Sequence, residues 1–247
     1  MSAEVLAAAI AIAFLAAMCM AVTGFGFALV MTPLLALIWD VKPTIASSVL
    51  LSTVALLPLL IEVRGNASMS RVSVLLVGSL AGIPPGVFLL ERLDAGALQV
   101  MVAATVIVAS ALLYFSPNLA GGEDTVRGRL MAGFVSGSIG SSTSLSGPPI
   151  VLYLLGRESD VAAFRATLLL FFLPGNVVTI LAFALVGQIT GDVLVLSVAA
   201  LPAIALGLMF GAWLRSHVQP ERFRAVVVAV LIVTSLAVLA SAVGAFG

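Results

Sequence analysis

The sequence predicts an all-α integral membrane protein with about eight transmembrane helices in two homologous four-helix halves, the first span of each half being broken. Three observations predict this fold. Of the 247 residues, 62% are hydrophobic and only 9% are charged. The charged residues leave eight long uncharged stretches, and two Gly- and Pro-containing segments resemble each other. A soluble domain of this length carries about a quarter charged residues, so lipid must be the main solvent of this chain.

The composition also excludes several kinds of protein. The 11 Lys and Arg are balanced by 11 Asp and Glu, so no basic excess would attract a nucleic acid. Cys19 is the single cysteine and His217 the single histidine, which rules out a disulfide framework and argues against a metal site. We therefore expect no nucleic-acid partner, no metal and no cofactor.

The uncharged stretches set the number of predicted spans. Each has at least 19 residues, and a helix needs about 20 apolar residues to cross a bilayer. They are rich in Leu, Val, Ala and Ile without alternation, which favours helices over the strands of a barrel. They run over 5–39, 43–61, 72–90, 95–122, 130–156, 166–191, 193–214 and 225–247. The whole chain, 1–247, is predicted to be one membrane-embedded domain.

The distribution of Lys and Arg predicts the orientation. When 5–39 is counted as one crossing, loops one, three, five and seven hold seven Lys and Arg residues, and loops two and four hold four. Cytoplasmic loops carry the excess of these residues. The sequence thus predicts a multi-pass protein of the inner cell membrane with both termini outside.

An internal duplication is indicated by matched residues. Gly24 and Pro33 are nine residues apart, as are Gly140 and Pro149. A Gly-xxx-Gly follows in each half, Gly82 to Gly86 and Gly207 to Gly211, for which close helix packing is the favoured interpretation. The halves are roughly 1–120 and 125–247. Four crossings in each half predict a parallel repeat, unless an extra segment crosses.

The first stretch of each half is expected to contain a break. A straight helix over 5–39 would be about 52 Å long, well beyond the bilayer core. Glycines and Pro33 in the first half, and glycines, hydroxyls and prolines over 137–149 in the second, disrupt a helix. Broken membrane helices at matching positions of two repeats indicate a transporter's binding site. Free N–H groups and serine hydroxyls there favour a small oxyanion.

These arguments define a set of candidate substrate-binding residues. Arg165 is either a donor to the anion or a flanking residue that reaches the lipid headgroups, and Asn176 either belongs to the site or makes a packing hydrogen bond. All the acidic residues lie in loops or at span edges, which argues against a cation pump and against an enzyme. The candidates are Gly24, Phe25, Gly26, Pro33, Gly140, Ser141, Ser142, Ser144, Ser146, Gly147, Pro148, Pro149, Arg165 and Asn176.

In its length, its eight predicted helices, its duplicated halves and the Gly-rich break followed by proline in each half, the chain resembles the TauE/SafE family of sulfite exporters, also called the TSUP anion permeases. It departs from the family in two segments. Gly24-Phe25-Gly26-Phe27 replaces the usual Gly-Gly-Gly-rich first motif, and Gly140-Ser141-Ser142 through Gly147-Pro148-Pro149 replaces the second. The resemblance implies transport of small anions such as sulfite, thiosulfate or sulfoacetate. We therefore expect a secondary permease that works by alternating access, with a small anion and the lipid bilayer as partners. A channel that uses the breaks as a filter is the alternative, followed by a membrane-embedded enzyme or a scaffold subunit. The sequence leaves open whether the protein forms a homo-oligomer.

Overall fold

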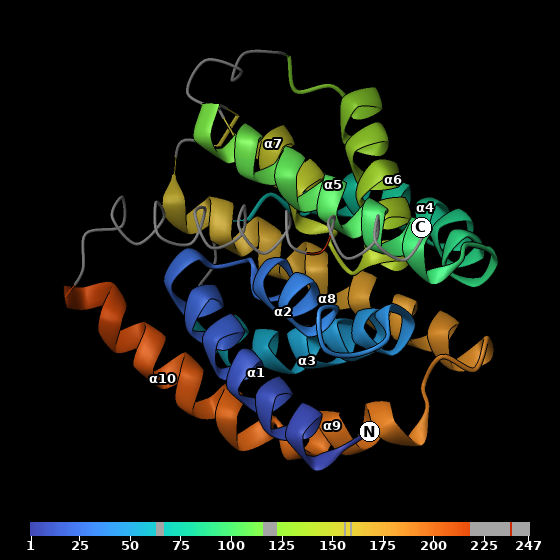
Figure 1. Ribbon diagram of the computed structural model, residues 1–247. Helices are drawn as coiled ribbons and strands as arrows, with labels where there is room; N and C mark the ends of the chain where they lie inside the picture. The colour runs from blue at the N-terminus through green and yellow to red at the C-terminus, as the bar shows by residue number, and fades with distance from the viewer. Residues whose placement is uncertain (63–66, 116–122, 156, 159, 218–237, 239–247) are drawn as a thin grey trace.

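The computed structural model describes residues 1–62, 67–115, 123–155, 157–158, 160–217 and 238. Over these residues the secondary structure is helical throughout (Figure 1). The helices are α1 (Ala3–Thr23), α2 (Phe27–Leu35), α3 (Val41–Glu62), α4 (Met69–Arg92), α5 (Ala95–Phe115), α6 (Val126–Thr143), α7 (Gly147–Leu154), α8 (Val161–Leu185), α9 (Gly191–Ala199) and α10 (Leu201–His217).

Several of these helices suit a bilayer. In the described part of the chain α1, α3, α4 and α8 are long and apolar enough to cross a membrane, and α9 with α10, bent by 43°, makes a fifth span if the pair is counted as one. Large apolar side chains are exposed, such as Leu185 at 89% and Ile61 at 81%, as expected of surfaces that face lipid. The predicted span 225–247 lies outside the described residues.

The first predicted break is present between α1 and α2. Gly24 (φ 84°) and Gly26 (φ 99°) are both in the left-handed region, which glycine adopts without steric cost. The Gly24 N–H donates to the carbonyl of Met20 at 2.7 Å and so closes the last turn of α1. Pro33, in contrast, lies within α2 near its end and does not belong to the break.

The second break, between α6 and α7, is centred on Ser144. Its φ of 66° is the only positive value for a non-glycine residue in the described part of the chain. The Ser144 N–H donates to the carbonyl of Gly140 at 2.7 Å, so Ser144 is the conformational counterpart of Gly24. Gly140 lies inside α6, and Pro149 lies in the first turn of α7. The sequence motif pairs Gly24 with Gly140, but the residue that matches Gly24 in the structure, Ser144, lies about one helical turn further along the chain.

Both short helices fold back along the helix that precedes them (Figure 1). In the second half, the Ser136 hydroxyl on α6 donates to the carbonyl of Ser146 at 2.6 Å, at the start of α7. Tyr153 near the end of α7 donates to Asp124, just before α6, at 2.6 Å. The segment α6–α7 is thus a hairpin with both ends on one side, whereas the sequence-based orientation counted it as one crossing. Uncharged length alone does not distinguish the two.

The glycine pairs bring two helix pairs into backbone contact. A Cβ on Gly82 of α4 would lie 2.2 Å from the Phe134 carbonyl oxygen of α6. Likewise, a Cβ on Gly207 of α10 would lie 2.4 Å from the Phe14 carbonyl oxygen of α1. Only glycine permits such an approach, so the packing interpretation of both Gly-xxx-Gly motifs is confirmed. Each hairpin's long helix, α1 or α6, thereby packs on a helix from the other half of the chain.

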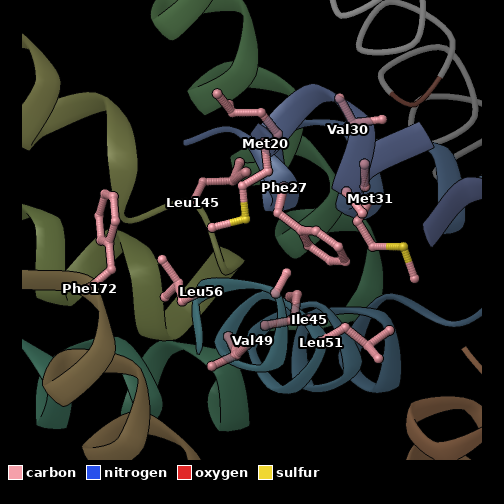
Figure 2. Close-up of a cluster of buried hydrophobic side chains, with 14 of the residues drawn as sticks. Met20, Phe27, Val30, Met31, Ile45, Val49, Leu51, Leu56, Leu145 and Phe172 are labelled. Atoms are coloured by element: carbon pink, nitrogen blue, oxygen red, sulfur yellow. The ribbon is translucent and has the colours of Figure 1, made fainter. Parts of the chain in front are cut away.

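The half-helix α2 occupies the centre of the apolar core. Phe27 and Met31 point from α2 toward Ile45 and Leu51 of α3 (Figure 2). Leu145 of the second break and Phe172 of α8 lie beside Met20 and Leu56 in the same cluster (Figure 2). The core thus holds the two breaks close together, although they are far apart in the sequence.

Candidate functional site

A small cavity lies where the two breaks meet. Its free volume is about 40 Å³, enough for on the order of three water molecules. It is bordered by the end of α1, both breaks, and the middle of α3 and of α8. The lining residues are Met20, Phe25, Gly26, Phe27, Ala28, Leu29, Ser52, Leu56, Ser144, Leu145, Ser146, Gly147, Phe172 and Asn176.

The N-terminus of α2 faces this cavity without a cap. Its N-cap residue, Gly26, has no side chain to accept a hydrogen bond from the first turn, and Phe27 is buried. The N-termini of α1, α6, α8 and α9 are each capped by a side chain: Ser2, Thr125, Asp160 and Thr190. The first-turn N–H groups of α2 therefore lack the side-chain partner that those helices provide, and they carry the positive end of the helix dipole.

The N-terminus of α7 also faces the cavity and makes no side-chain cap hydrogen bond from Ser146. Its first turn differs from that of α2, because Pro148 and Pro149 have no N–H. Proline is tolerated there since those N–H groups would lack a helical partner anyway. Among the first three residues of α7, Gly147 alone can donate from the backbone. The amide donors of the cavity therefore come mainly from α2.

Side-chain hydroxyls and one amide complete the polar lining. The Ser144 hydroxyl lies 2.5 Å from the Thr32 hydroxyl of α2, which links the second break to the first half-helix. The Asn176 amide of α8 donates to the Ser52 hydroxyl of α3 at 3.3 Å. Neither Thr32 nor Ser52 is among the candidate residues that the sequence indicates. Only their hydroxyls in apolar stretches could have pointed to them, and that signal is weak.

A second, smaller cavity of about 10 Å³ adjoins the first. Both are lined by Ser144, Ser146, Phe172 and Asn176, and the second adds the hydroxyls of Ser136, Ser141 and Thr179 together with Gly140. The Ser141 hydroxyl donates to the carbonyls of Gly137 and Ile83, which fixes it between α6 and α4. Polar groups from α6 and α8 thus continue beyond the first cavity.

The candidate residues from the sequence fall into three groups. Phe25, Gly26, Ser144, Ser146, Gly147 and Asn176 line the main cavity, and Gly140 and Ser141 line the adjoining one. The Ser142 hydroxyl donates within α6 to the carbonyls of Ser138, at 2.8 Å, and Ile139. Gly24, Pro33, Ser142, Pro148, Pro149 and Arg165 do not line either cavity.

Arg165 lies against the first break instead. It is half-buried on α8, and its Nε would be 2.9 Å from a Cβ placed on Gly24. The guanidinium group therefore approaches the end of α1, on the outer side of the turn that leads into α2. It brings a positive charge close to the break without lining the cavity itself.

A charged cluster fixes the end of the second hairpin. Asp124 accepts hydrogen bonds from Arg129 at 2.8 Å, from Arg71 at 3.1 Å and from Tyr153 at 2.6 Å. Arg71 also pairs with Glu158. The hydrogen bonds from the Arg129 guanidinium hold the pKa of the Asp124 carboxyl well below its usual range. The cluster joins the end of α7 to the beginnings of α4 and α6.

Comparison with known proteins gives one match. A family model described as sulfite exporter TauE/SafE matches residues 9–238, which include both breaks and every residue that lines the two cavities. No curated protein and no solved structure matches the chain. Over the described residues, no group of three or more His, Cys, Asp and Glu side chains is placed to hold a metal ion.

Proposed function

The chain belongs to the TauE/SafE family of sulfite exporters, a family of membrane transporters, and from this membership we propose that it is a secondary permease for small oxyanions. Sulfite, thiosulfate, sulfoacetate and related organosulfur or carboxylate anions are the proposed substrates. The proposed binding site is the cavity between the two breaks. The observation that carries this assignment is that two half-helix N-termini without side-chain caps face one cavity.

The chemistry of the cavity suits an anion. N–H groups at a helix N-terminus point toward the ligand and carry partial positive charge, so they bind oxyanions without a charged side chain. The amides of Phe27, Ala28 and Leu29 would be the main donors, joined by the Ser144 hydroxyl and the Asn176 amide. Arg165, behind Gly24, would add a longer-range attraction rather than a direct contact. The free volume suits a small anion.

We further propose that the two halves are inverted repeats. Three pairs of landmarks are separated by the same number of residues: Gly24 with Ser144, Phe27 with Gly147, and Val41 with Val161. This constant spacing supports a duplication. It aligns Gly24 with Ser144, whereas the proline spacing in the sequence had aligned Gly24 with Gly140. Each half then consists of a re-entrant hairpin followed by crossing helices.

The directions of α3 and α8 support inversion. Lys42 at the start of α3 donates to the Glu91 carbonyl near the end of α4 at 3.1 Å. Glu158, just before α8, pairs with Arg71 at the start of α4. The two equivalent helices therefore start at opposite ends of α4. A hairpin that does not cross leaves an odd number of crossings per half, which inverts the second half relative to the first. Movement of one half against the other would give alternating access.

The fold-back also sharpens the proposed orientation. Among the described residues, six arginines lie at the end of the molecule where α4, α6 and α8 begin and α10 ends, and Lys42 and Arg92 lie at the opposite end. This bias supports our proposal that the arginine-rich end faces the cytoplasm. The Met1 amino group, paired with Asp192 at 2.9 Å, is then outside. The arginines are Arg71, Arg127, Arg129, Arg157, Arg165 and Arg215.

Transport in proteoliposomes tests the site. Ser144→Gly removes a hydroxyl from the cavity while suiting the positive φ, and Asn176→Ala removes the amide. Loss of a hydrogen bond to a charged group costs about 1.5–3 kcal/mol, so we expect uptake of radiolabelled sulfite or thiosulfate to fall by about tenfold or more. Ser142→Ala is the matched control because its hydroxyl bonds only within α6. Normal uptake in both site variants would refute the site, and large single-channel currents would assign the protein to the channels.

A further inference from the structure

Three hydroxyls in the first half of α3 are buried without a partner. Thr44, Ser47 and Ser48 are each 0% exposed, and none makes a hydrogen bond among the described residues. Serine and threonine in a helix usually donate to a carbonyl on the preceding turn. On the same helix Thr53 does so, to Val49 at 2.7 Å. A buried hydroxyl without a partner destabilises the state that contains it, so these groups point to a ligand or to water in another state of the protein.

The spacing of two of these hydroxyls leads to the cavity. Thr44, Ser48 and Ser52 recur every four residues, so they lie on successive turns of one face of α3. The row is about 12 Å long at the rise of an α-helix. Its inner end, Ser52, lines the main cavity and accepts the hydrogen bond of Asn176. Its outer end, Thr44, is in the first turn of α3.

The outer end of the row suits an anion. Lys42, the only lysine of the chain, stands one turn or less from Thr44 and donates to the Glu91 carbonyl. The start of α3 adds the positive end of a helix dipole. A small anion at this end would therefore meet the positive end of the helix dipole and a row of hydroxyl donors, with Lys42 on the other side of α3.

The equivalent face of α8 differs. With the register of the repeat, Phe164, Leu168 and Phe172 take the places of Thr44, Ser48 and Ser52. Leu168 is fully buried and Phe172 lines both cavities. This row offers no hydrogen bond to an anion. The row of Thr44, Ser48 and Ser52 thus has no counterpart on α8, although Thr167, at the position of Ser47, is also a buried hydroxyl without a partner among the described residues.

We propose that Thr44, Ser48 and Ser52 form a half-path that takes up water and conducts the anion between the cavity and the face at which α3 begins. The proposal rests on the permease function above, because the anion comes from it. In the structure described above, the hydroxyls of Thr44 and Ser48 have no hydrogen-bond partner among the described residues. When the protein opens toward this face, water and the anion supply the missing hydrogen bonds.

Cysteine accessibility tests the half-path without any substrate. Cys19 is the only native cysteine, so Cys19→Ala gives a thiol-free background. Thr44→Cys and Ser48→Cys are compared with Ala46→Cys, a fully buried position on the opposite face of the same helix. Each full-length variant is exposed in membrane vesicles of both orientations to a charged, membrane-impermeant methanethiosulfonate. Labelling after denaturation in SDS verifies that each introduced thiol is reactive. Elution as one species in detergent verifies that each variant is folded.

We expect Thr44→Cys and Ser48→Cys to react at least tenfold faster than Ala46→Cys, and only from the face of the membrane at which α3 begins. Equal rates at the three positions, or labelling from the opposite face, would overturn the half-path. Its failure is distinguishable from failure of the permease. A protein that takes up anions but shows no labelling along the row loses only the half-path. A protein that shows labelling but moves no anion keeps the half-path and loses the permease function.

Discussion

Gly24 and Arg165 are in direct contact across the two halves of the chain. A Cβ on Gly24 would lie 2.9 Å from Nε and 3.2 Å from Cγ of Arg165. The left-handed turn that ends α1 is therefore covered by an arginine from α8, the first long helix after the second break. Any movement of the α1–α2 hairpin against α8 must change this contact, because Gly24 belongs to the hairpin and Arg165 to α8.

Gly24→Ala is expected to destabilise the protein. Alanine at a φ of 84° is strained, and its Cβ would also displace the Arg165 side chain. The strain alone costs about 1–2 kcal/mol, and we expect a lower melting temperature in detergent together with slower anion uptake. Gly191→Ala is the control, since no atom lies within 4 Å of its added Cβ. Adding Arg165→Ala to Gly24→Ala should recover part of the loss, the part due to the clash. Wild-type stability of Gly24→Ala would contradict the left-handed turn.

Gly82→Ala is expected to separate α4 from α6. The added Cβ would lie 2.2 Å from the Phe134 carbonyl oxygen, and a backbone atom cannot rotate away. Overpacking of this kind costs about 1–3 kcal/mol. Gly175→Ala on α8 is a matched control, because its Cβ would make only an ordinary contact of 3.8 Å with Ser79. Fluorescence-detected size exclusion after heating measures both. Equal melting temperatures for the two variants would refute the close α4–α6 contact.

The sequence predicts the breaks because their cause is local. The uncharged stretch 5–39 is too long for one straight helix that crosses the bilayer. Two glycines in its middle can adopt the positive φ angles of the left-handed turn without steric cost. The same holds for Gly82 and Gly207, whose spacing of small residues is itself the packing signal. These features need no information about distant parts of the chain.

Other features depend on the tertiary structure and leave little trace in the sequence. Charge spacing gives the length of an uncharged stretch, but whether the chain crosses or returns is decided by contacts such as Tyr153 with Asp124. Serine is uncommon in the left-handed region, so Ser144 carries no signal for its turn. The density of hydroxyls pointed to Ser142 and Ser144 alike. Only the direction of each side chain on α6 separates the one that bonds its own helix from the one beside Thr32.

Asp124→Asn is expected to weaken the attachment of α7 and to change the acid dependence of stability. The pKa of Asp124 is lowered in the folded protein, so its ionised form stabilises the fold above the ordinary aspartate pKa of about 4. That contribution is lost only as the pH falls below this value toward the lowered pKa. Melting temperatures between pH 7 and pH 3, in roughly one-unit steps, should therefore fall more in the wild type than in Asp124→Asn. Tyr153→Phe, which removes one donor and leaves both arginine contacts, should lie between them. Parallel pH profiles would show that Asp124 does not stabilise the hairpin.

The inverted repeat that we propose predicts which face of the membrane each helix end reaches. Ser68, at the start of α4, and Ala95, at the start of α5, are exposed and lie at opposite ends of the molecule. In the Cys19→Ala background, Ser68→Cys should react with an impermeant maleimide only in inside-out vesicles, and Ala95→Cys only in right-side-out vesicles or intact cells. The stronger test is Glu158→Cys, because a single crossing over 130–156 would put it on the face of Ala95, whereas the α6–α7 hairpin puts it beside Arg71 on the face of Ser68. Labelling of Glu158→Cys from the same face as Ala95→Cys would contradict the hairpin. It would show that 130–156 crosses the membrane once, as the sequence predicts, and would support the parallel repeat and the weaker charge bias of that topology.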